Sequence, residues 1–452
     1  MRLQRLFLWV LFCLAAAGLT SFAGAQQAAD NAVPDHYVVQ LRQDVAPQAV
    51  ISAHGLRPDF VYTRAVKGFA GFVPPGQLRA LKQDPSVLSI APDRVIKAVG
   101  NVDVQVKPDS PGKPGGGAPK QVVPEGVKRI GAAPANATFT GKGVGVAVVD
   151  TGLDFAHADL AVASDSFTAY GSSAQDDDGH GTHVGGIIAA LNNKICVVGV
   201  APDATLYAVK VLNSAGKGTD STVIAGLDWV AANAAAVSPP IRVVNMSLGR
   251  DGTLGDDSAL RAAIQSLHTA GISITVAAGN DPYLEVSEQV PATYPEVMAI
   301  ASTSALGGTS KYRFFPSGIA ADTASYFTTD GAFNFTTGIG VTVSAPGENQ
   351  ENVTKAGKIQ SVGILSTKLG GGTVQMSGTS MSAPHVAGVV ARVLEALEAN
   401  PEAGADPETI RTLIMENALL PGTAPYDSPT SSYSFDGERE GIVSVPELWV
   451  GP

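Results

Sequence analysis

The stretch GVGVAVVD, from Gly143 to Asp150, is a near-continuous apolar run that ends in a carboxylate. Five later runs of this kind, separated by stretches with helical patterning, are LYAVKVL, RVVNMSL, ISITVAAGN, EVMAIAST and GVTVSAPG. Strands that are apolar on both faces and alternate with helices form a parallel sheet covered by helices on both faces. The sequence therefore predicts an α/β fold, in which functional side chains gather at the carboxyl ends of the strands.

Two polar residues mark such strand ends. Asp150 ends the first run and Asn280 ends the fourth. A buried carboxylate needs a partner, because leaving it unpaired in an apolar environment is costly. Taken alone, Asp150 is equally well explained as the N-cap of the turn that follows it.

Two helices are expected to begin at residues that can do acyl-transfer chemistry. DDDGHGTHVGGIIAAL presents His180 at a helix start, and MSGTSMSAPHVAG does the same for Ser380. A helix N-terminus favours developing negative charge, which suits a nucleophile. Pro384 is tolerated only in the first turn of a helix, so the helix is expected to begin close to it. Singly, His180 is also explained as a capping or core histidine, and Ser380 as a helix cap.

Together the three residues occur in the order Asp150, His180, Ser380, with VNMSLG and AAGN between them. With these motifs the chain resembles the subtilisin-like serine proteases, or subtilases. The resemblance implies that Ser380 attacks the peptide carbonyl, that His180 is its general base and that Asp150 orients the imidazole. It also implies that the side chain of Asn280 completes an oxyanion hole with the backbone N–H of Ser380.

The same resemblance implies an endopeptidase of broad specificity that prefers an apolar residue before the scissile bond. Two segments would bind the peptide as an added strand, namely Gly216, Lys217, Gly218 and Ser247, Leu248, Gly249. One wall of the pocket for the residue before the scissile bond, called here the primary pocket, would be Ala277, Ala278 and Gly279. Gln289 stands where the family often has glycine, which leaves the depth of this pocket open.

LNNKICVVGVAP, from Leu191 to Pro202, resembles the strong calcium loop of the family. The implied ligands are the side chains of Gln121, Asp159 and Asn193 and the carbonyls of Leu191, Ile195 and Val197. Such oxygen ligands suit Ca²⁺ better than zinc or magnesium. We expect Gln121 to join the site only once the preceding linker is cut or moved. An ordinary solvated loop is the alternative, and Cys196 stands where the family often has glycine.

The first 120 residues predict export and self-inhibition. Residues 1–25 combine two arginines, an apolar run and a small-residue cleavage site, as a secretory signal peptide does. A membrane anchor is the alternative, although the apolar run is short for a span. Residues 35–99 predict a small α+β unit whose KGFAGFV and SIAPDRV resemble the inhibitory pro-domain of subtilases. A Pro/Gly-rich linker at 100–120 then precedes a catalytic domain at 121–452, with the first cut expected near Val99.

Composition narrows the remaining choices. With 452 residues, 45% of them apolar, the chain can bury a sizeable core. Residues 1–120 hold 13 Lys/Arg against 8 Asp/Glu, whereas residues 121–452 hold 17 Lys/Arg against 33 Asp/Glu. The acidic charge of the second part argues against nucleic acid as a partner. It also favours docking of the basic leading segment on the acidic part. After export only Cys196 remains, which excludes an intramolecular disulfide.

We therefore expect a secreted, monomeric serine endopeptidase made as a zymogen. A catalytically silent peptide-binding protein on the same fold is the main rival. An unrelated esterase would show a G-x-S-x-G motif, whereas Ser380 lies in G-T-S-M-S. Residues 306–339 and 348–362 exceed the usual connections of the family and are expected to be loops.

Overall fold

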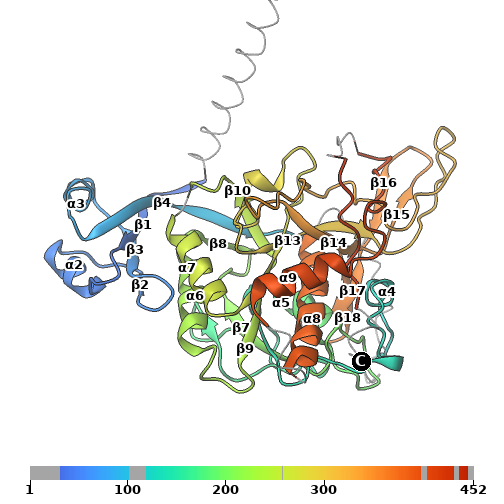
Figure 1. Cartoon of the computed structure of the whole chain (residues 1–452), viewed down its shortest axis with the longest axis horizontal. Coiled ribbons are helices and arrows are strands. Elements are labelled where there is room, and N and C mark those ends of the chain that lie inside the picture. The colour runs from blue at the N-terminus through green and yellow to red at the C-terminus, as the bar shows by residue number, and fades with distance from the viewer. Residues whose placement is uncertain (1–30, 101–118, 257, 399–404, 432–436, 446–452) are drawn as a thin grey trace, which may run out of the picture.

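The computed structural model describes residues 31–100, 119–256, 258–398, 405–431 and 437–445 (Figure 1). The predicted signal peptide and most of the predicted linker lie outside the described residues. Within the described ranges, no helix is long and apolar enough to cross a membrane.

A seven-stranded sheet forms the centre of the larger part of the chain. Its strands follow the order β14-β13-β11-β9-β5-β7-β6, and all neighbours in it are parallel. The strands are β5 (Gly145–Asp150), β6 (Phe167–Thr168), β7 (Thr205–Lys210), β9 (Ile241–Met246), β11 (Ser273–Ala277), β13 (Met298–Ser304) and β14 (Val341–Glu348). The predicted α/β fold with a parallel sheet is confirmed, and Asp150 is the last residue of its strand.

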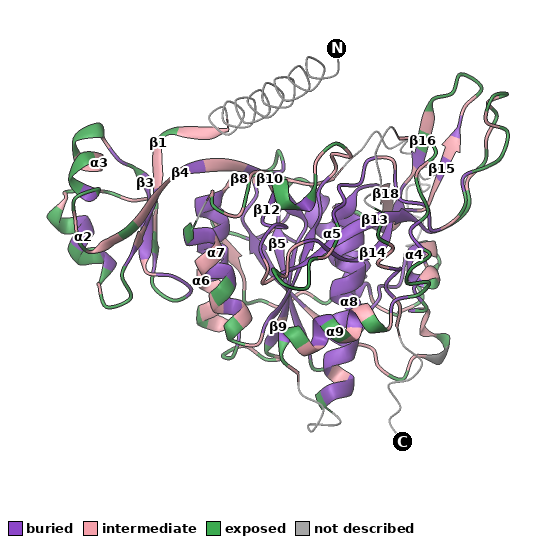
Figure 2. Ribbon diagram, turned by 45° about the horizontal axis from the view of Figure 1, so that its top comes forward, coloured by how far each residue is buried: buried purple, intermediate pink, exposed green. Residues whose placement is uncertain are grey.

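Helices cover both faces of this sheet. Because successive residues of a strand point to opposite sides, neighbouring residues of β5 enter two different cores. Ala147 and Val149 of β5 pack in the core under α6 (Asp220–Asn233) and α7 (Ser258–Thr269). Val146 and Val148 pack in the core under α5 (His180–Ala189) and α8 (Thr379–Glu398). The short α4 (Glu125–Arg129) and α9 (Pro407–Glu416) contribute to this second core, and Figure 2 shows how deeply α5 and α8 are buried.

Pro384 lies in the second turn of α8, so the expectation that it would lie in the first turn is wrong. A proline at this position leaves the carbonyl of Ser380 without its helical N–H donor. Ser247 Oγ donates a hydrogen bond to that carbonyl at 2.9 Å. A hydroxyl from another part of the chain therefore replaces the missing helical donor, and the helix can begin at Thr379.

Residues 31–100, called here the N-terminal unit, form a separate α+β layer beside the main body (Figure 1). Its elements are β1 (Ala32–Leu41), α2 (Pro47–Ala53), β2 (Phe60–Tyr62), β3 (Gly68–Phe72), α3 (Pro75–Leu81) and β4 (Val87–Ala98). The unit has a hydrophobic core of its own. β4 runs beyond this core and pairs antiparallel with β8 (Lys217–Thr219) and β10 (Leu248–Asp251) of the main body.

The two long insertions differ from each other. Residues 348–362 contain an antiparallel hairpin of β15 (Gln350–Val353) and β16 (Ile359–Val362), so the expectation of a plain loop is wrong here. Residues 306–339 carry no helix or named strand, and a bridge between Ser310 and Val353 holds them against the hairpin. A second hairpin of β17 (Ile364–Thr367) and β18 (Thr373–Met376) leads into α8. The smaller elements are η1 (Pro134–Asn136), η2 (Val286–Glu288) and β12 (Gln289–Val290).

Candidate active site

Asp150 and His180 meet at the carboxyl edge of the sheet. His180 is the first residue of α5, and Gly179 before it has a φ of 109° that favours glycine in the turn. The imidazole Nδ1 lies 2.8 Å from Asp150 Oδ1 and 3.0 Å from Oδ2, with both side chains buried. Burial alone would lower the pKa of His180, but the charge and hydrogen bond of Asp150 outweigh it and raise that pKa.

Ser380 lies on the other side of the same point. Its Oγ donates to the carbonyl of Ser247 at 3.0 Å, while His180 Nε2 is buried without a hydrogen-bond partner among the described residues. Both face Gly100: a Cβ there would lie 2.7 Å from His180 Nε2 and 3.9 Å from Ser380 Cβ. The structure thus brings the two residues together around one peptide bond without a hydrogen bond between them.

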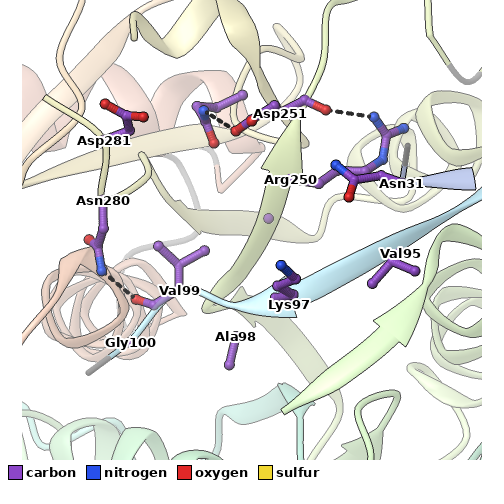
Figure 3. A pocket seen from close by; sticks show the side chains of 12 residues that line it. Asn31, Val95, Lys97, Ala98, Val99, Gly100, Arg250, Asp251, Asn280 and Asp281 are labelled. Atoms are coloured by element: carbon purple, nitrogen blue, oxygen red, sulfur yellow. Dashed lines mark hydrogen bonds between the residues drawn. The ribbon is translucent and has the colours of Figure 1, made fainter. Parts of the chain in front are cut away.

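The carbonyl of Val99 lies between two donors. The backbone N–H of Ser380 donates to it at 3.3 Å and Asn280 Nδ2 at 3.2 Å, and Figure 3 shows the amide of Asn280 aimed at it. Asn280 was expected to end its strand, but β11 ends three residues earlier, at Ala277. Gly378 passes so close that a Cβ would lie 2.9 Å from both Asn280 Nδ2 and Val99 O, so no larger residue fits there.

Thr379 is a functional residue that the sequence did not single out. Its backbone N–H and its hydroxyl both donate to Asn280 Oδ1 at 2.9 Å. These two bonds fix which end of the Asn280 amide faces Val99, so that Nδ2 is the donor. The sequence does show a hydroxyl directly before Ser380, in GTS. Its role depends on contact with Asn280, which is 99 residues away in the chain, so the sequence alone did not reveal it.

The end of β4 lies as a strand between the two predicted substrate-binding segments. Register pairs are Val95–Thr219, Ile96–Gly218 and Lys97–Lys217 on one side, and Lys97–Gly249 and Ala98–Leu248 on the other. The N–H of Ala98 donates to the carbonyl of Gly216 at 2.9 Å, and that of Val99 to the carbonyl of Ser247 at 3.1 Å. All six residues of these segments therefore border the N-terminal unit.

A cavity of about 270 Å³ lies beside Val99 and is also lined by Gly249, Asn280 and Gln289 (Figure 3). The predicted wall residues Ala277, Ala278 and Gly279 are not among the residues that line it. Val99 Cγ2 is 3.4 Å from the position of a Cβ on Gly249. Gln289 is only 6% exposed, packs against Gly279, and donates from Nε2 to Asp251 Oδ1 at 3.1 Å. Ala277 and Ala278 are buried.

The residues of the predicted calcium loop converge. Gln121 Nε2 lies 2.7 Å from the carbonyl oxygen of Leu191 and 3.0 Å from that of Val197. Asp159 Oδ2 accepts from the N–H of Val197, and its Oδ1 is buried with no partner among the described residues. The orphaned oxygen of Asp159 suits a hard cation. The carbonyls of Leu191 and Val197 already accept from the amide nitrogen of Gln121, so this amide would have to turn for a cation to bind them.

Two predicted ligands are less directly placed. Asn193 Oδ1 accepts from the N–H of Ile195 at 3.1 Å and its Nδ2 donates to the carbonyl of Ala158. No cluster of three or more His, Cys, Asp or Glu in the described ranges could hold a metal, so a cation here would depend on amide and carbonyl oxygens.

Gln121 lies in this loop in the uncut chain, so cleavage is not needed to bring it there. The expectation that the linker must be cut or moved also involves residues 101–118, which lie outside the described residues. The residues between Gly100 and Gln121 can span about 70 Å when extended, which leaves both ends free to dock. β4 can therefore lie in the groove while Gln121 of the same molecule lies in the predicted calcium loop.

Comparisons with known proteins bear on the family of this chain. A family model described as the subtilase family matches residues 141–439. Subtilisin E of Bacillus subtilis (strain 168) is 33% identical over 407 residues, which cover 87% of this chain and 90% of that protein. The thermostable alkaline protease of Halalkalibacterium halodurans is 35% identical over 319 residues, 70% of this chain and 69% of that protein. A solved cold adapted subtilisin-like serine proteinase is 29% identical, covers 68% of this chain and 89% of its own, and has a TM-score of 0.48.

Proposed function

Because the chain belongs to the subtilase family and is a subtilisin-like serine endopeptidase, we propose that it cleaves peptide bonds with Ser380, His180 and Asp150. The observation that carries the proposal is the carbonyl of Val99, which accepts from Ser380 N–H and Asn280 Nδ2. His180 Nε2 faces the next residue, where the leaving nitrogen would be.

The chemistry follows from these positions. Ser380 Oγ turns from the carbonyl of Ser247 to the substrate carbonyl carbon and gives its proton to His180 Nε2. The electron pair of the carbonyl moves to its oxygen, where Asn280 Nδ2 and Ser380 N–H stabilise the negative charge. His180 then protonates the leaving nitrogen as the C–N bond breaks, and water hydrolyses the acyl-enzyme with His180 as base. Asp150 holds Nδ1 protonated throughout and stabilises the imidazolium.

The enzyme is made as a zymogen whose own first substrate is the Val99–Gly100 bond. After this cut, residues 35–99 stay in place as a product-like inhibitor, with β4 filling the substrate groove. Further contacts with α6 support such retention. Asp93 accepts from the N–H and hydroxyl of Ser221 at the start of α6, and Asp228 accepts from the N–H groups of residues 63–65.

Substrate choice is set mainly by the primary pocket. The strand pairing uses main-chain groups and therefore accepts many sequences. Gln289, anchored on Asp251, occupies the space beside Gly279 that a large side chain would need. The predicted apolar preference is therefore narrowed to small aliphatic residues such as valine, the residue found at position 99.

A structural Ca²⁺ would be held by Gln121, Asp159, Leu191, Asn193, Ile195 and Val197. The ion would supply positive charge to Asp159 Oδ1 and to the converging carbonyls, and it takes no part in the hydrolysis. We expect the chain to be exported by residues 1–25, to act outside the cell as a monomer on protein substrates, and to keep no membrane anchor once the signal is removed. Nucleic acid is not an expected partner of the acidic body.

The test is labelling of the purified, processed protein with a serine-directed phosphonate, followed by peptide mapping and N-terminal sequencing. We expect an adduct on Ser380 alone, loss of casein hydrolysis in Ser380→Ala, and a first cut at Val99–Gly100 that this variant cannot make. Full casein hydrolysis by Ser380→Ala would overturn the mechanism. A mature N-terminus upstream of residue 90 would overturn the processing scheme.

A further inference from the structure

Two inserted segments join into one arm that projects from the main body, as Figures 1 and 2 show at β15 and β16. The segments are residues 306–320 and the hairpin at 350–362, and together they are called here the arm. The N–H of Lys311 donates to the carbonyl of Val353 at 2.8 Å, and the N–H of Val353 donates to the carbonyl of Thr309 at 2.8 Å. Main-chain hydrogen bonds therefore add residues 309–311 to the edge of the hairpin.

Side chains fix the arm in one arrangement. The N–H and the hydroxyl of Thr309 both donate to Asn352 Oδ1 at 2.8 Å. The ring of Tyr312 lies over the hairpin turn, because a Cβ on Gly357 would lie 3.2 Å from Tyr312 Cζ. The rings of Tyr312 and Phe314 meet edge to face, with their centroids 5.4 Å apart. The end of the arm is therefore a built surface, with the aromatic side chains of one segment seated on the turn of the other.

The arm is strongly basic, although it belongs to an acidic body. Its four cations are all exposed, and they are Lys311, Arg313, Lys355 and Lys358. Within the described part of the chain, none of the four forms an ion pair with a carboxylate. The one carboxylate in the sequence of the arm, Glu351, is only 1% exposed. The surface of the arm thus carries positive charge alone, whereas residues 121–452 hold 17 Lys/Arg against 33 Asp/Glu.

An aromatic ring stands exposed among these cations. Phe314 is 68% exposed, although phenylalanine is among the residues most often buried. The guanidinium of Arg313 lies over this ring, 4.2 Å from its centroid. At a bilayer surface, aromatic rings enter the boundary with the acyl chains while basic groups stay at the level of the headgroups. A basic tip with an exposed phenylalanine fits that boundary.

The projection of the arm explains how an acidic protein could meet an anionic surface. β15 and β16 have four residues each, which gives strands of about 13 Å at about 3.3 Å per residue. The Debye length at physiological ionic strength is about 8 Å, so a flat surface that touches the tip is largely screened from the negative charge behind the arm. A single-stranded nucleic acid instead needs a basic groove that follows several nucleotides.

We propose that the tip of the arm binds the surface of a bilayer that contains anionic lipid, with the four cations among the headgroups and Phe314 inserted between them. Attachment of this kind is peripheral and reversible, because four charges and one ring bind far more weakly than a spanning helix. The inference goes beyond the proposed hydrolysis and uses none of its residues. It adds a place of action, the membrane surface, to the proposed activity.

The test is co-sedimentation of the protein with lipid vesicles. The chain is expressed from residue 26, so that the apolar run of the predicted signal peptide cannot itself bind lipid. Vesicles of phosphatidylcholine alone are compared with vesicles of equal parts phosphatidylcholine and phosphatidylserine. One variant combines Lys355→Gln with Lys358→Gln, and a second carries Phe314→Ala.

Each variant has a matched control outside the arm. Lys142→Gln combined with Lys368→Gln removes the same charge from two other exposed lysines. Phe335→Ala removes another exposed ring, since Phe335 is 82% exposed. These controls separate an effect of the arm from a general effect of net charge or of exposed apolar surface.

We expect wild type to bind the vesicles with phosphatidylserine and to bind pure phosphatidylcholine far more weakly. Each cation near an anionic surface contributes about fivefold in affinity, so the double lysine variant should bind about 30-fold more weakly. Phe314→Ala should bind about tenfold more weakly or less tightly still, because the inserted ring is lost. Both controls should follow wild type. Binding by wild type should disappear at about 1 M salt, where the Debye length is about 3 Å.

Wild type that does not bind phosphatidylserine vesicles, or arm variants that bind them no more weakly than their controls, would overturn the inference. A labelled single-stranded oligonucleotide tests the other class of polyanion. Loss of oligonucleotide binding in the arm variants, with vesicle binding unchanged, would make nucleic acid the partner instead. Casein hydrolysis by each sample shows that the variants are folded. If wild type fails to hydrolyse casein, the proposed function has failed, whereas sedimentation still decides the role of the arm.

Discussion

Replacing Gln289 with alanine should change the enzyme from one that prefers valine before the scissile bond into one that accepts phenylalanine. The side chain of Gln289 is almost fully buried, and its Cγ would lie 3.1 Å from a Cβ on Gly279, so it takes up space beside this residue of the proposed primary pocket. Gln289→Ala removes four heavy atoms, about the difference in size between valine and phenylalanine. At about 0.8 kcal/mol per buried methylene, the opened pocket offers phenylalanine about 2–3 kcal/mol. This corresponds to about a 30- to 160-fold gain in kcat/KM.

The assay is a series of peptide p-nitroanilides that differ only in the residue before the scissile bond, with alanine, valine, leucine and phenylalanine compared. Gln265→Ala is the matched control, because Gln265 lies on α7 and donates to Glu296 away from the groove. Asp251→Ala should give an intermediate result, since Gln289 then stays in place but loses its anchor. Wild-type enzyme that already prefers phenylalanine over valine, or a Gln289→Ala profile equal to that of wild type, would refute the reasoning.

Four further predictions concern the rest of the site. Asp150→Asn should fold but lose about 10⁴-fold in kcat, because an amide cannot hold His180 in the reactive tautomer, and activity within a few-fold of wild type would make Asp150 a structural cap. Since Asp150 raises the pKa of His180 and the base must be neutral, the acidic limb of the wild-type kcat profile should lie above the ordinary 6.5, and a limb below it contradicts this. Thr379→Val should lower kcat about tenfold with KM nearly unchanged, since Asn280 loses one of the bonds that orient it, and a kcat equal to wild type would count against that role. Chelation should lower the midpoint of thermal inactivation of the processed enzyme, with about 2.7 kcal/mol expected at a hundredfold excess of Ca²⁺ over its dissociation constant, and an unmoved midpoint with no calcium by elemental analysis would exclude the loop as a site.

The parallel sheet and the position of Asp150 were predictable because a strand buried on both faces has a continuous run of apolar residues in the sequence. Residues 145–150 are all buried, and such a run needs no information from elsewhere in the chain. His180 is similar, since the turn at Gly179 and the helix after it are local features. The same holds for the strand that ends near Val99, although its place between β8 and β10 came from resemblance.

Features that depend on distant partners were missed or wrongly predicted. The start of α8 was misjudged because the carbonyl freed by Pro384 is satisfied by Ser247, which is 133 residues from Ser380. The hairpin within 348–362 looked like a loop because its polar, glycine-containing sequence lacks a long apolar run.

Ser247 shows how closely substrate binding and nucleophile placement are joined. Its carbonyl accepts from the N–H of Val99 and from Ser380 Oγ, while its own hydroxyl donates to the backbone carbonyl of Ser380. The edge that binds the peptide therefore also completes the helix that carries the nucleophile. Attack requires Ser380 Oγ to leave the carbonyl of Ser247, so in this structure the groove is filled and the hydroxyl is turned aside. In the proposed scheme, a strand that stays seated after cleavage inhibits by occupying the groove, and its departure frees the same carbonyl for the next substrate.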